Sequence, residues 1–143
     1  MDVHKQMSRM VDAVQPHCDE PITAAMTCSH AGSMSSLLAS KLAGGALGTA
    51  RTSDLPNPVF LAVGNDTVYA FHYRPRGFKF KIKKEAARWP RRDLTVAVEE
   101  TSRMCYFTVT TASGDSYALE VTTVMGAKDL VDVFIAALGG RRL

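Results

Sequence analysis

The chain has 143 residues, of which 46% are hydrophobic and 22% charged, the size and composition of a single globular domain with a core of its own. It contains no run of 18 apolar residues, so the sequence predicts no membrane-spanning helix. The formal net charge is only +3, but residues 74–92 hold nine basic residues and one acid, whereas the rest of the chain holds eight basic residues and 13 acids. A mildly acidic protein therefore carries one strongly basic segment, and such a local field attracts anions whatever the total charge.

The first 45 residues predict one strand between two short helices. Apolar residues recur at helical spacing from Val3 to Val14, so we expect an amphipathic helix over about residues 3–15. Apolar and polar side chains alternate over residues 22–29, and this period of two favours a strand. Residues 33–45 place methionine and leucine side chains on one helical face ahead of two glycines, which predicts a second helix.

From residue 59 onward the pattern changes to short strands separated by turns. Residues 64–67 form a hairpin turn by composition, and Arg-Pro-Arg-Gly at 74–77 predicts a second turn. The predicted strands cover residues 59–63, 68–74, 78–84, 94–100, 104–112 and 116–123. A helix over about residues 126–138 closes the chain, because its apolar residues form a single stripe made of Leu130, Val131, Phe134, Ile135 and Leu138.

These elements predict a mainly β fold of the α+β class. A helix with one apolar face that follows an antiparallel meander must bury this face against the sheet. Closure of the sheet would remove its exposed edges, so we expect a small antiparallel barrel of about seven strands capped by the C-terminal helix. The chain is predicted to be a single domain over residues 1–143, with a helical extension at 1–18 and a helical insertion at 33–45 after the first strand.

Seven strands followed by a C-terminal amphipathic helix resemble the pleckstrin-homology (PH) superfold. The residues that carry the resemblance are LPNPVFLAVGNDTVYAF, RPRGFKFKI, RWPRRDLTV, FTVTTASGDSYALEV and the closing helix, which together span positions 55–138, with ITAAMTCSHAG as the first strand. The sequence is similar to small bacterial PH-like proteins, of an uncharacterised actinobacterial type. The resemblance implies a non-catalytic binding or scaffold module rather than an enzyme.

One property of the wider family does not transfer to this chain. Eukaryotic PH domains often bind phosphoinositides through basic residues in the loop between their first two strands. The corresponding region here, around Gly32, is almost uncharged, and the basic residues lie instead on the strand after RPRG and in the turn behind it. Function cannot be inferred from a shared fold alone, so the prediction of a binding site depends on the basic segment.

In the stretch FKFKIKK, the apolar residues Phe78, Phe80 and Ile82 alternate with lysines, which predicts a strand with one apolar and one basic face. The simplest interpretation of the lysines is a solvated face, or protection of a strand edge. It leaves unexplained the arginines of the flanking turns, whose guanidinium groups suit phosphate or carboxylate. The alternative is an anion-binding site made of Arg74, Arg76, Lys79, Lys81, Lys83, Lys84, Arg88, Arg91 and Arg92.

The partner predicted for such a site is an anionic membrane surface or an acidic protein. A membrane surface would gain on the order of 1 kcal/mol per nearby basic residue, which suits weak and reversible docking. Single-stranded nucleic acid ranks behind both, because no RNA- or DNA-binding motif occurs and most aromatic residues are expected in the barrel. An N-terminus without a signal-peptide core, and three cysteines without a Cys-x-x-Cys pair, predict a cytoplasmic location, with or without peripheral membrane attachment.

A second hypothesis is a structural or oligomerising module without a dedicated ligand. In this hypothesis the N-terminal helix packs its Met7, Met10 and Val11 face on another copy of the chain. The single tryptophan, Trp89, fits either a membrane-interface aromatic or, more commonly, a residue packed on the barrel.

Catalysis and metal binding are not predicted. His17-Cys18 and Cys28-x-His30 supply possible ligands, but the Cys-x-x-Cys and His-x-x-x-His spacings of structural zinc sites do not occur. Nothing in the spacing of Cys105 and His72 requires them to meet as a nucleophile and base. We therefore expect no metal, no cofactor and no active site.

Overall fold

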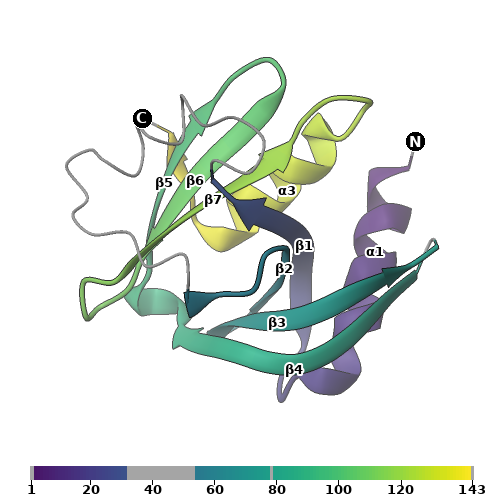
Figure 1. Cartoon of the computed structure of the whole chain (residues 1–143), viewed down its shortest axis with the longest axis horizontal. Coiled ribbons are helices and arrows are strands. Elements are labelled where there is room, and N and C mark those ends of the chain that lie inside the picture. The colour runs from purple at the N-terminus through teal and green to yellow at the C-terminus, as the bar shows by residue number, and fades with distance from the viewer. Residues whose placement is uncertain (1, 32–53, 78, 143) are drawn as a thin grey trace.

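The computed structural model describes residues 2–31, 54–77 and 79–142. Within them, eight strands follow the order β4-β3-β2-β1-β7-β6-β5-β8, flanked by two α-helices (Figure 1). The strands are β1 (Ile22–His30), β2 (Val59–Gly64), β3 (Thr67–Arg76), β4 (Lys79–Pro90), β5 (Thr95–Glu100), β6 (Met104–Thr110), β7 (Ser116–Thr122) and β8 (Arg141–Arg142). The helices are α1 (Val3–Val14) and α3 (Lys128–Leu138), with the 3-10 turns η1 (Gln15–His17) and η3 (Arg91–Asp93).

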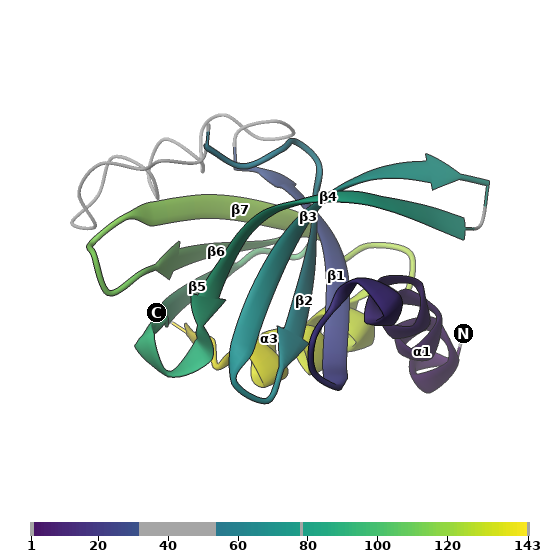
Figure 2. The ribbon, with the colours of Figure 1, turned by 90° about the horizontal axis from the view of Figure 1, so that it is seen from below.

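Strand β1 joins the two halves of this sheet. Its residues from Ile22 to Cys28 pair with β2, and its last two residues, Ser29 and His30, pair with β7. The pairs among β1 to β7 are all antiparallel, whereas the two-residue β8 runs parallel to β5. The strands β1–β4 and β5–β7 thus form two halves of one bent sheet, and Figure 2 shows the bend.

The C-terminal helix closes the core as the sequence predicts. All five residues of its apolar stripe are buried. Phe134 meets Phe107 of β6 edge to face, with ring centroids 6.3 Å apart, and the helix also packs against β1. Gly139 ends the helix in the left-handed region, and its N–H donates to the carbonyl oxygens of Ile135 and Ala136. Neither helix in the described part of the chain is long and apolar enough to cross a membrane.

The N-terminal helix packs on the same core. The side chain of Asp2 accepts a backbone N–H of the first turn at 3.2 Å and so caps the helix. Met7, Met10 and Val14 are each 7% exposed or less, and the N–H of Ala25 in β1 lies 3.3 Å from the sulfur of Met7. Most of the apolar face that the oligomer hypothesis assigns to a second copy is therefore covered within one chain.

These features confirm the predicted α+β fold, a PH-like layout with seven antiparallel strands and a capping C-terminal helix. The predicted closure differs, since in the described ranges no pairing joins β4 to the other end of the sheet, which bends without closing. The predicted helical insertion at 33–45 lies outside the described residues. The predicted turn at 74–77 is wrong for Arg74 to Arg76, which belong to β3 and pair with β4, whereas Gly77 lies in the turn as predicted. β4 also runs on to Pro90, because Ala87 and Trp89 continue the pairing with β3 beyond the lysines.

Glu20 fastens the connector between α1 and β1 to the turn between β2 and β3. Its Oε1 accepts the backbone N–H groups of Asp66 and Thr67, each at 2.9 Å. Gly64 makes room for this contact, since a Cβ atom at position 64 would lie 2.0 Å from the same oxygen. Because Gly64 has no side chain, the carboxylate of Glu20 can approach the turn and accept charge-assisted hydrogen bonds from two backbone N–H groups.

We expect Gly64→Ala to lower the free energy of unfolding by about 1–3 kcal/mol, because the new Cβ displaces Glu20 and leaves the two amides without their acceptor. In a Glu20→Ala background the same substitution should cost little, since the group it collides with is gone. Urea denaturation of the four proteins of this cycle measures the coupling. Equal costs of Gly64→Ala in both backgrounds would contradict the role assigned to Glu20.

Candidate anion-binding site

The structure divides the nine predicted residues into two groups with different surroundings. Six lie toward the Gly77 end of the β3–β4 hairpin, and we call them the basic hairpin cluster: Arg74, Arg76, Lys79, Lys81, Lys83 and Lys84. Three lie at the other end of β4 and in η3: Arg88, Arg91 and Arg92. The prediction that the arginines occupy turns is wrong for Arg74, Arg76 and Arg88, which are strand residues.

Four residues of the basic hairpin cluster form two like-charged pairs. Arg74 lies opposite Lys81 and Arg76 lies opposite Lys79, so all four side chains share one face of the hairpin. All six residues of the cluster are exposed, and within the described ranges none forms an ion pair with an acid. Like charges at opposite positions destabilise a sheet. The fold by itself therefore gives no reason for this arrangement.

The other face of the hairpin is apolar and holds the hairpin to the body of the protein. The rings of Tyr73 and Phe80 meet edge to face at 6.1 Å, and each meets Phe60 of β2 at 5.5 Å. Ile82 is 8% exposed. The predicted alternation of apolar and basic faces is confirmed over residues 79–83, and Phe78 lies outside the described residues.

Two register shifts in the pairing of β3 with β4 bend this hairpin. They fall between Ala70 and Phe71 and between Phe71 and Tyr73, and such irregularities increase the local bend and twist. The pairing of β2 with β3 reaches only to Phe71 in the described part of the chain, so the cluster is carried by a two-stranded ribbon. Figure 2 shows this ribbon extending away from the rest of the sheet.

Protection of the exposed strand edges accounts for charge on this ribbon but not for its sign. Lysines, prolines and irregular pairing all discourage another chain from adding to an edge. An acid opposite a cation would protect the edge equally well and would also stabilise the hairpin. The ribbon uses cations at all four positions of the two pairs, so edge protection does not explain the choice.

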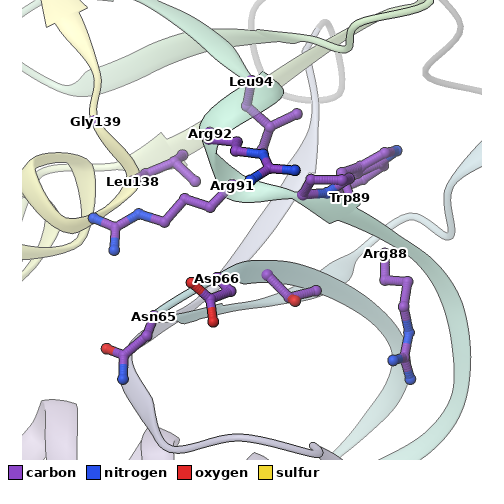
Figure 3. Close-up of a pocket in the computed structure, with 11 residues that line it drawn as sticks. Asn65, Asp66, Arg88, Trp89, Arg91, Arg92, Leu94, Leu138 and Gly139 are labelled. Atoms are coloured by element: carbon purple, nitrogen blue, oxygen red, sulfur yellow. The ribbon is translucent and has the colours of Figure 1, made fainter.

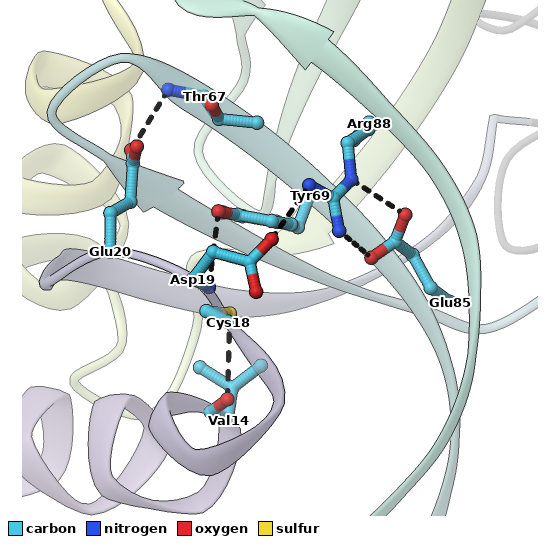
Figure 4. A network of polar contacts seen from close by, with 8 residues as sticks. All are labelled: Val14, Cys18, Asp19, Glu20, Thr67, Tyr69, Glu85 and Arg88. Atoms are coloured by element: carbon cyan, nitrogen blue, oxygen red, sulfur yellow. Dashed lines mark hydrogen bonds and ion pairs between the residues drawn. The ribbon is translucent and has the colours of Figure 1, made fainter.

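Arg88 is the partner of two acids of the chain itself. Its guanidinium donates to Glu85 at 2.7 and 2.8 Å and to Asp19 at 2.9 Å, and it lies 5.0 Å from the ring centroid of Tyr69 (Figure 4). The hydrogen bonds that Glu85 accepts from Arg88 hold the pKa of its carboxyl group below the usual range. Because Asp19 precedes β1, the contacts tie the connector after α1 to β4.

Cys18 lies in the same network (Figure 4) and is a poor nucleophile. Its thiol donates to the carbonyl oxygen of Val14 at 3.5 Å. Burial, with the negative charges of Glu85 and Asp19, raises the pKa of Cys18 to about 11. Burial also raises the pKa of Cys28. Both groups therefore remain thiols at neutral pH, and neither offers a thiolate for catalysis.

Arg91 caps the C-terminal end of α3. Its guanidinium donates to the carbonyl oxygens of Ala137 and Gly64, the latter at 3.4 Å. Figure 3 shows its side chain extended toward the end of this helix, near Leu138 and Gly139. The last carbonyl groups of a helix lack helical partners and carry partial negative charge, so a cation is favourable there. Arg91 thus has a structural role that its charge already explains.

A pocket of about 640 Å³ opens beside Arg91, between η3 and the turn from β2 to β3 (Figure 3). Its lining includes Asp66, Trp89 and Arg92. The ring of Trp89 packs with that of Tyr117 of β7 at 5.3 Å, which agrees with the interpretation of this tryptophan as a residue packed on the body of the fold. Since the pocket carries charges of both signs, it does not continue the basic hairpin cluster.

No group of three or more His, Cys, Asp or Glu side chains in the described part of the chain is arranged to hold a metal ion. His30 has another role, since its Nε2 lies 2.9 and 3.0 Å from the carbonyl oxygens of Leu55 and Pro56. This contact fastens the segment ahead of β2 to the end of β1.

Comparisons with known proteins assign the chain to no family. No family model matches it, and no curated protein matches it. A solved structure of Vav1 inhibited by an allosteric inhibitor aligns with 95% of this chain, at 10% sequence identity and a TM-score of 0.47. The chain spans 33% of the length of that structure's chain. A likeness of this degree carries no argument about function.

We expect Arg88→Gln to lower the thermal unfolding midpoint at neutral pH, because it leaves the carboxylates of Glu85 and Asp19 without their shared cation. The folded-state pKa of Glu85 is depressed, so this stabilisation is present above about pH 4.5 and is lost as the pH falls through the folded pKa. Melting curves between pH 7 and pH 3 measure it. Lys84→Gln is the matched control, and an equal, pH-independent loss in both variants would contradict the assignment.

Alkylation of Cys18 should accelerate to half its maximal rate near pH 11 rather than near pH 9, the ordinary value for cysteine. Since the folded-state pKa is raised, the stability that the neutral thiol contributes is present below about pH 9 and is lost as the pH rises toward 11. Asp19→Asn removes one negative charge and should lower the pKa. Mass spectrometry after reaction with iodoacetamide identifies the modified residue. A half-maximal alkylation rate near pH 9 would refute the claim that burial and the neighbouring acids raise the pKa of Cys18.

Proposed function

We propose that this chain belongs with the small PH-like proteins of actinobacterial type and acts as a non-catalytic module that recognises an anionic surface through the basic hairpin cluster. The observation that carries the proposal is that Arg74 lies opposite Lys81, and Arg76 opposite Lys79, on an exposed ribbon. An anion on this face would relieve a repulsion that the isolated protein leaves uncompensated.

The charge of the cluster suits a surface rather than a single small ion. Its six cations project from two adjacent strands, whereas a built site for one small anion would surround it from several sides. A membrane of anionic lipids gains on the order of 1 kcal/mol per basic residue held near it, so the cluster supports reversible docking that salt weakens. An acidic protein surface would use the same groups.

Single-stranded nucleic acid is the poorer candidate, because it needs exposed aromatic rings beside the cations. In the described part of the hairpin, Tyr73 and Phe80 pack inward on Phe60. At the other end of β4, Trp89 packs on Tyr117. Rings held in this way support the fold and are not free to stack on bases.

Lys81→Glu should weaken binding to vesicles of phosphatidylcholine with phosphatidylserine by about tenfold or more, because it removes one attraction and adds one repulsion. The same substitution should stabilise the fold by about 0.2–1 kcal/mol, since it turns the pair with Arg74 into one of opposite charge. Sedimentation with vesicles of graded anionic content, at low and physiological salt, measures binding. Urea denaturation measures stability.

Arg92→Glu is the matched control, since it changes the net charge equally at an exposed residue outside the cluster. It should bind almost as well as the original protein. Equal losses in the two variants would show a response to net charge alone and would refute a site on the hairpin. Binding to poly-glutamate but not to anionic vesicles would assign the cluster to an acidic protein partner.

A further inference from the structure

The loop between β7 and α3 exposes two apolar side chains to solvent. Met125 is 91% exposed and Val124 is 38% exposed. In the described part of the chain, Val133 of α3 is the one other large hydrophobic residue that is exposed, at 44%. Exposed apolar surface is therefore concentrated at this loop, and Met125 is its most prominent residue.

The backbone of Met125 has a conformation that methionine seldom adopts. Its φ is 57°, in the left-handed region where glycine and asparagine are favoured, and Gly126 follows at 81°. Asparagine at this position would fit the backbone better and would remove an apolar group from water. A residue in a strained backbone conformation is usually retained because its side chain serves another purpose. Neither core packing nor the turn requires a methionine at this position.

A hollow of about 370 Å³ separates this loop from the end of the β3–β4 hairpin. Gly77 and Phe80 line it from the hairpin, and Ala127 and Leu130 line it from the start of α3. Figures 1 and 2 both place the β7–α3 loop and the end of the hairpin on the same side of the molecule. The start of α3, which follows the apolar loop, and the end of the hairpin thus lie on two sides of one hollow, which the hairpin faces with Phe80 rather than with its basic residues.

Two further cations lie beside this hollow and this loop. Arg9 of α1 lines the hollow. The carbonyl oxygen of Arg103 accepts the N–H of Thr123 at 2.9 Å and the hydroxyl of Thr122 at 3.4 Å, which places this residue next to the loop. Both arginines are exposed, and neither forms an ion pair with an acid in the described ranges. An apolar tip with cations around it matches the order of groups at a membrane surface, where anionic headgroups surround an apolar interior.

We propose that Val124 and Met125 insert among the acyl chains of an anionic bilayer while the basic hairpin cluster, Arg9 and Arg103 contact the lipid headgroups. This inference rests on the proposed function, because the cluster brings the loop to the bilayer. A bilayer fits better than an acidic protein, since it offers negative charge and an apolar interior within the depth of one side chain. On a purely acidic surface Met125 would stay in water, and no favourable contact would offset the strain in its backbone.

The first experiment compares Met125→Asn with Val133→Asn by sedimentation with vesicles of phosphatidylcholine and phosphatidylserine. Met125→Asn should weaken binding about tenfold, which is the effect of removing one partly inserted apolar side chain. Its stability to urea should be unchanged or higher, because asparagine tolerates the left-handed backbone. Val133→Asn removes an exposed apolar side chain outside the loop and should leave vesicle binding unchanged. Unchanged binding of Met125→Asn would overturn the insertion.

The second experiment places an environment-sensitive fluorophore at the loop through Met125→Cys. Of the native thiols, Cys28 and Cys105 are buried and Cys18 has a raised pKa, so labelling at neutral pH favours the introduced group. Emission should shift to the blue on addition of anionic vesicles, and lipids brominated on their acyl chains should quench it. The same label attached through Val133→Cys should respond to neither. A loop label that brominated lipids fail to quench would overturn the proposal.

The two proposals fail in different ways. If Lys81→Glu weakens vesicle binding but Met125→Asn does not, the insertion is overturned and the anionic-surface module stands. If the original protein binds poly-glutamate but not anionic vesicles at low salt, the insertion is again overturned, and the module recognises an acidic protein. If it binds neither, both proposals are refuted.

Discussion

The fold depends on β1, which pairs with β2 along most of its length and with β7 at its end, and whose central residues are buried. Its neighbours Ala24 and Ala25 point to opposite faces, and both are fully buried. Both helices pack against this strand, α1 through Met7 and α3 through its apolar stripe. At Ala25 the small side chain accompanies a close approach of α1, since the backbone N–H lies 3.3 Å from the sulfur of Met7. The strand that joins the two halves of the bent sheet is therefore also the strand on which the helices pack.

The basic segment has two roles because its two ends have different neighbours. Near η3, the arginines have partners within the chain. Arg88 donates hydrogen bonds to the carboxylates of Glu85 and Asp19, and Arg91 donates to a carbonyl oxygen at the end of α3. Farther along the ribbon, Arg74 lies opposite Lys81 and Arg76 lies opposite Lys79, so cations face cations. A run of nine positive charges in the sequence thus becomes a structural group at one end and an uncompensated surface at the other.

The fold could be predicted because it follows from local patterns. The alternation at 22–29 and the stripe from Leu130 to Leu138 each appear in the structure as expected, since a face that must be buried leaves a period in the sequence. The division of the candidate site could not be predicted. Asp19 and Arg88 are far apart in the chain, and nothing in their spacing shows that they meet. Pro75 indicates a turn in the sequence, but in the structure it lies in β3, because pairing with β4 outweighs the preference of proline for a turn.

The two ends of the sheet differ in what discourages a strand of another molecule from pairing with them. The edge at β5 is occupied by β8, and Gly140, the residue before β8, has so little room that a Cβ atom there would lie 2.6 Å from the side chain of Ile135. The edge at β4 has no strand beside it in the described part of the chain and presents lysines, an irregular register and a terminal proline. A second molecule that extended the sheet at this edge would add its strand beside the lysines of β4, and two copies paired there through β4 would bring their lysines together. Concentrated solutions of this β-rich protein should therefore resist polymerisation through strand addition, and raised salt should weaken that resistance on the β4 side first.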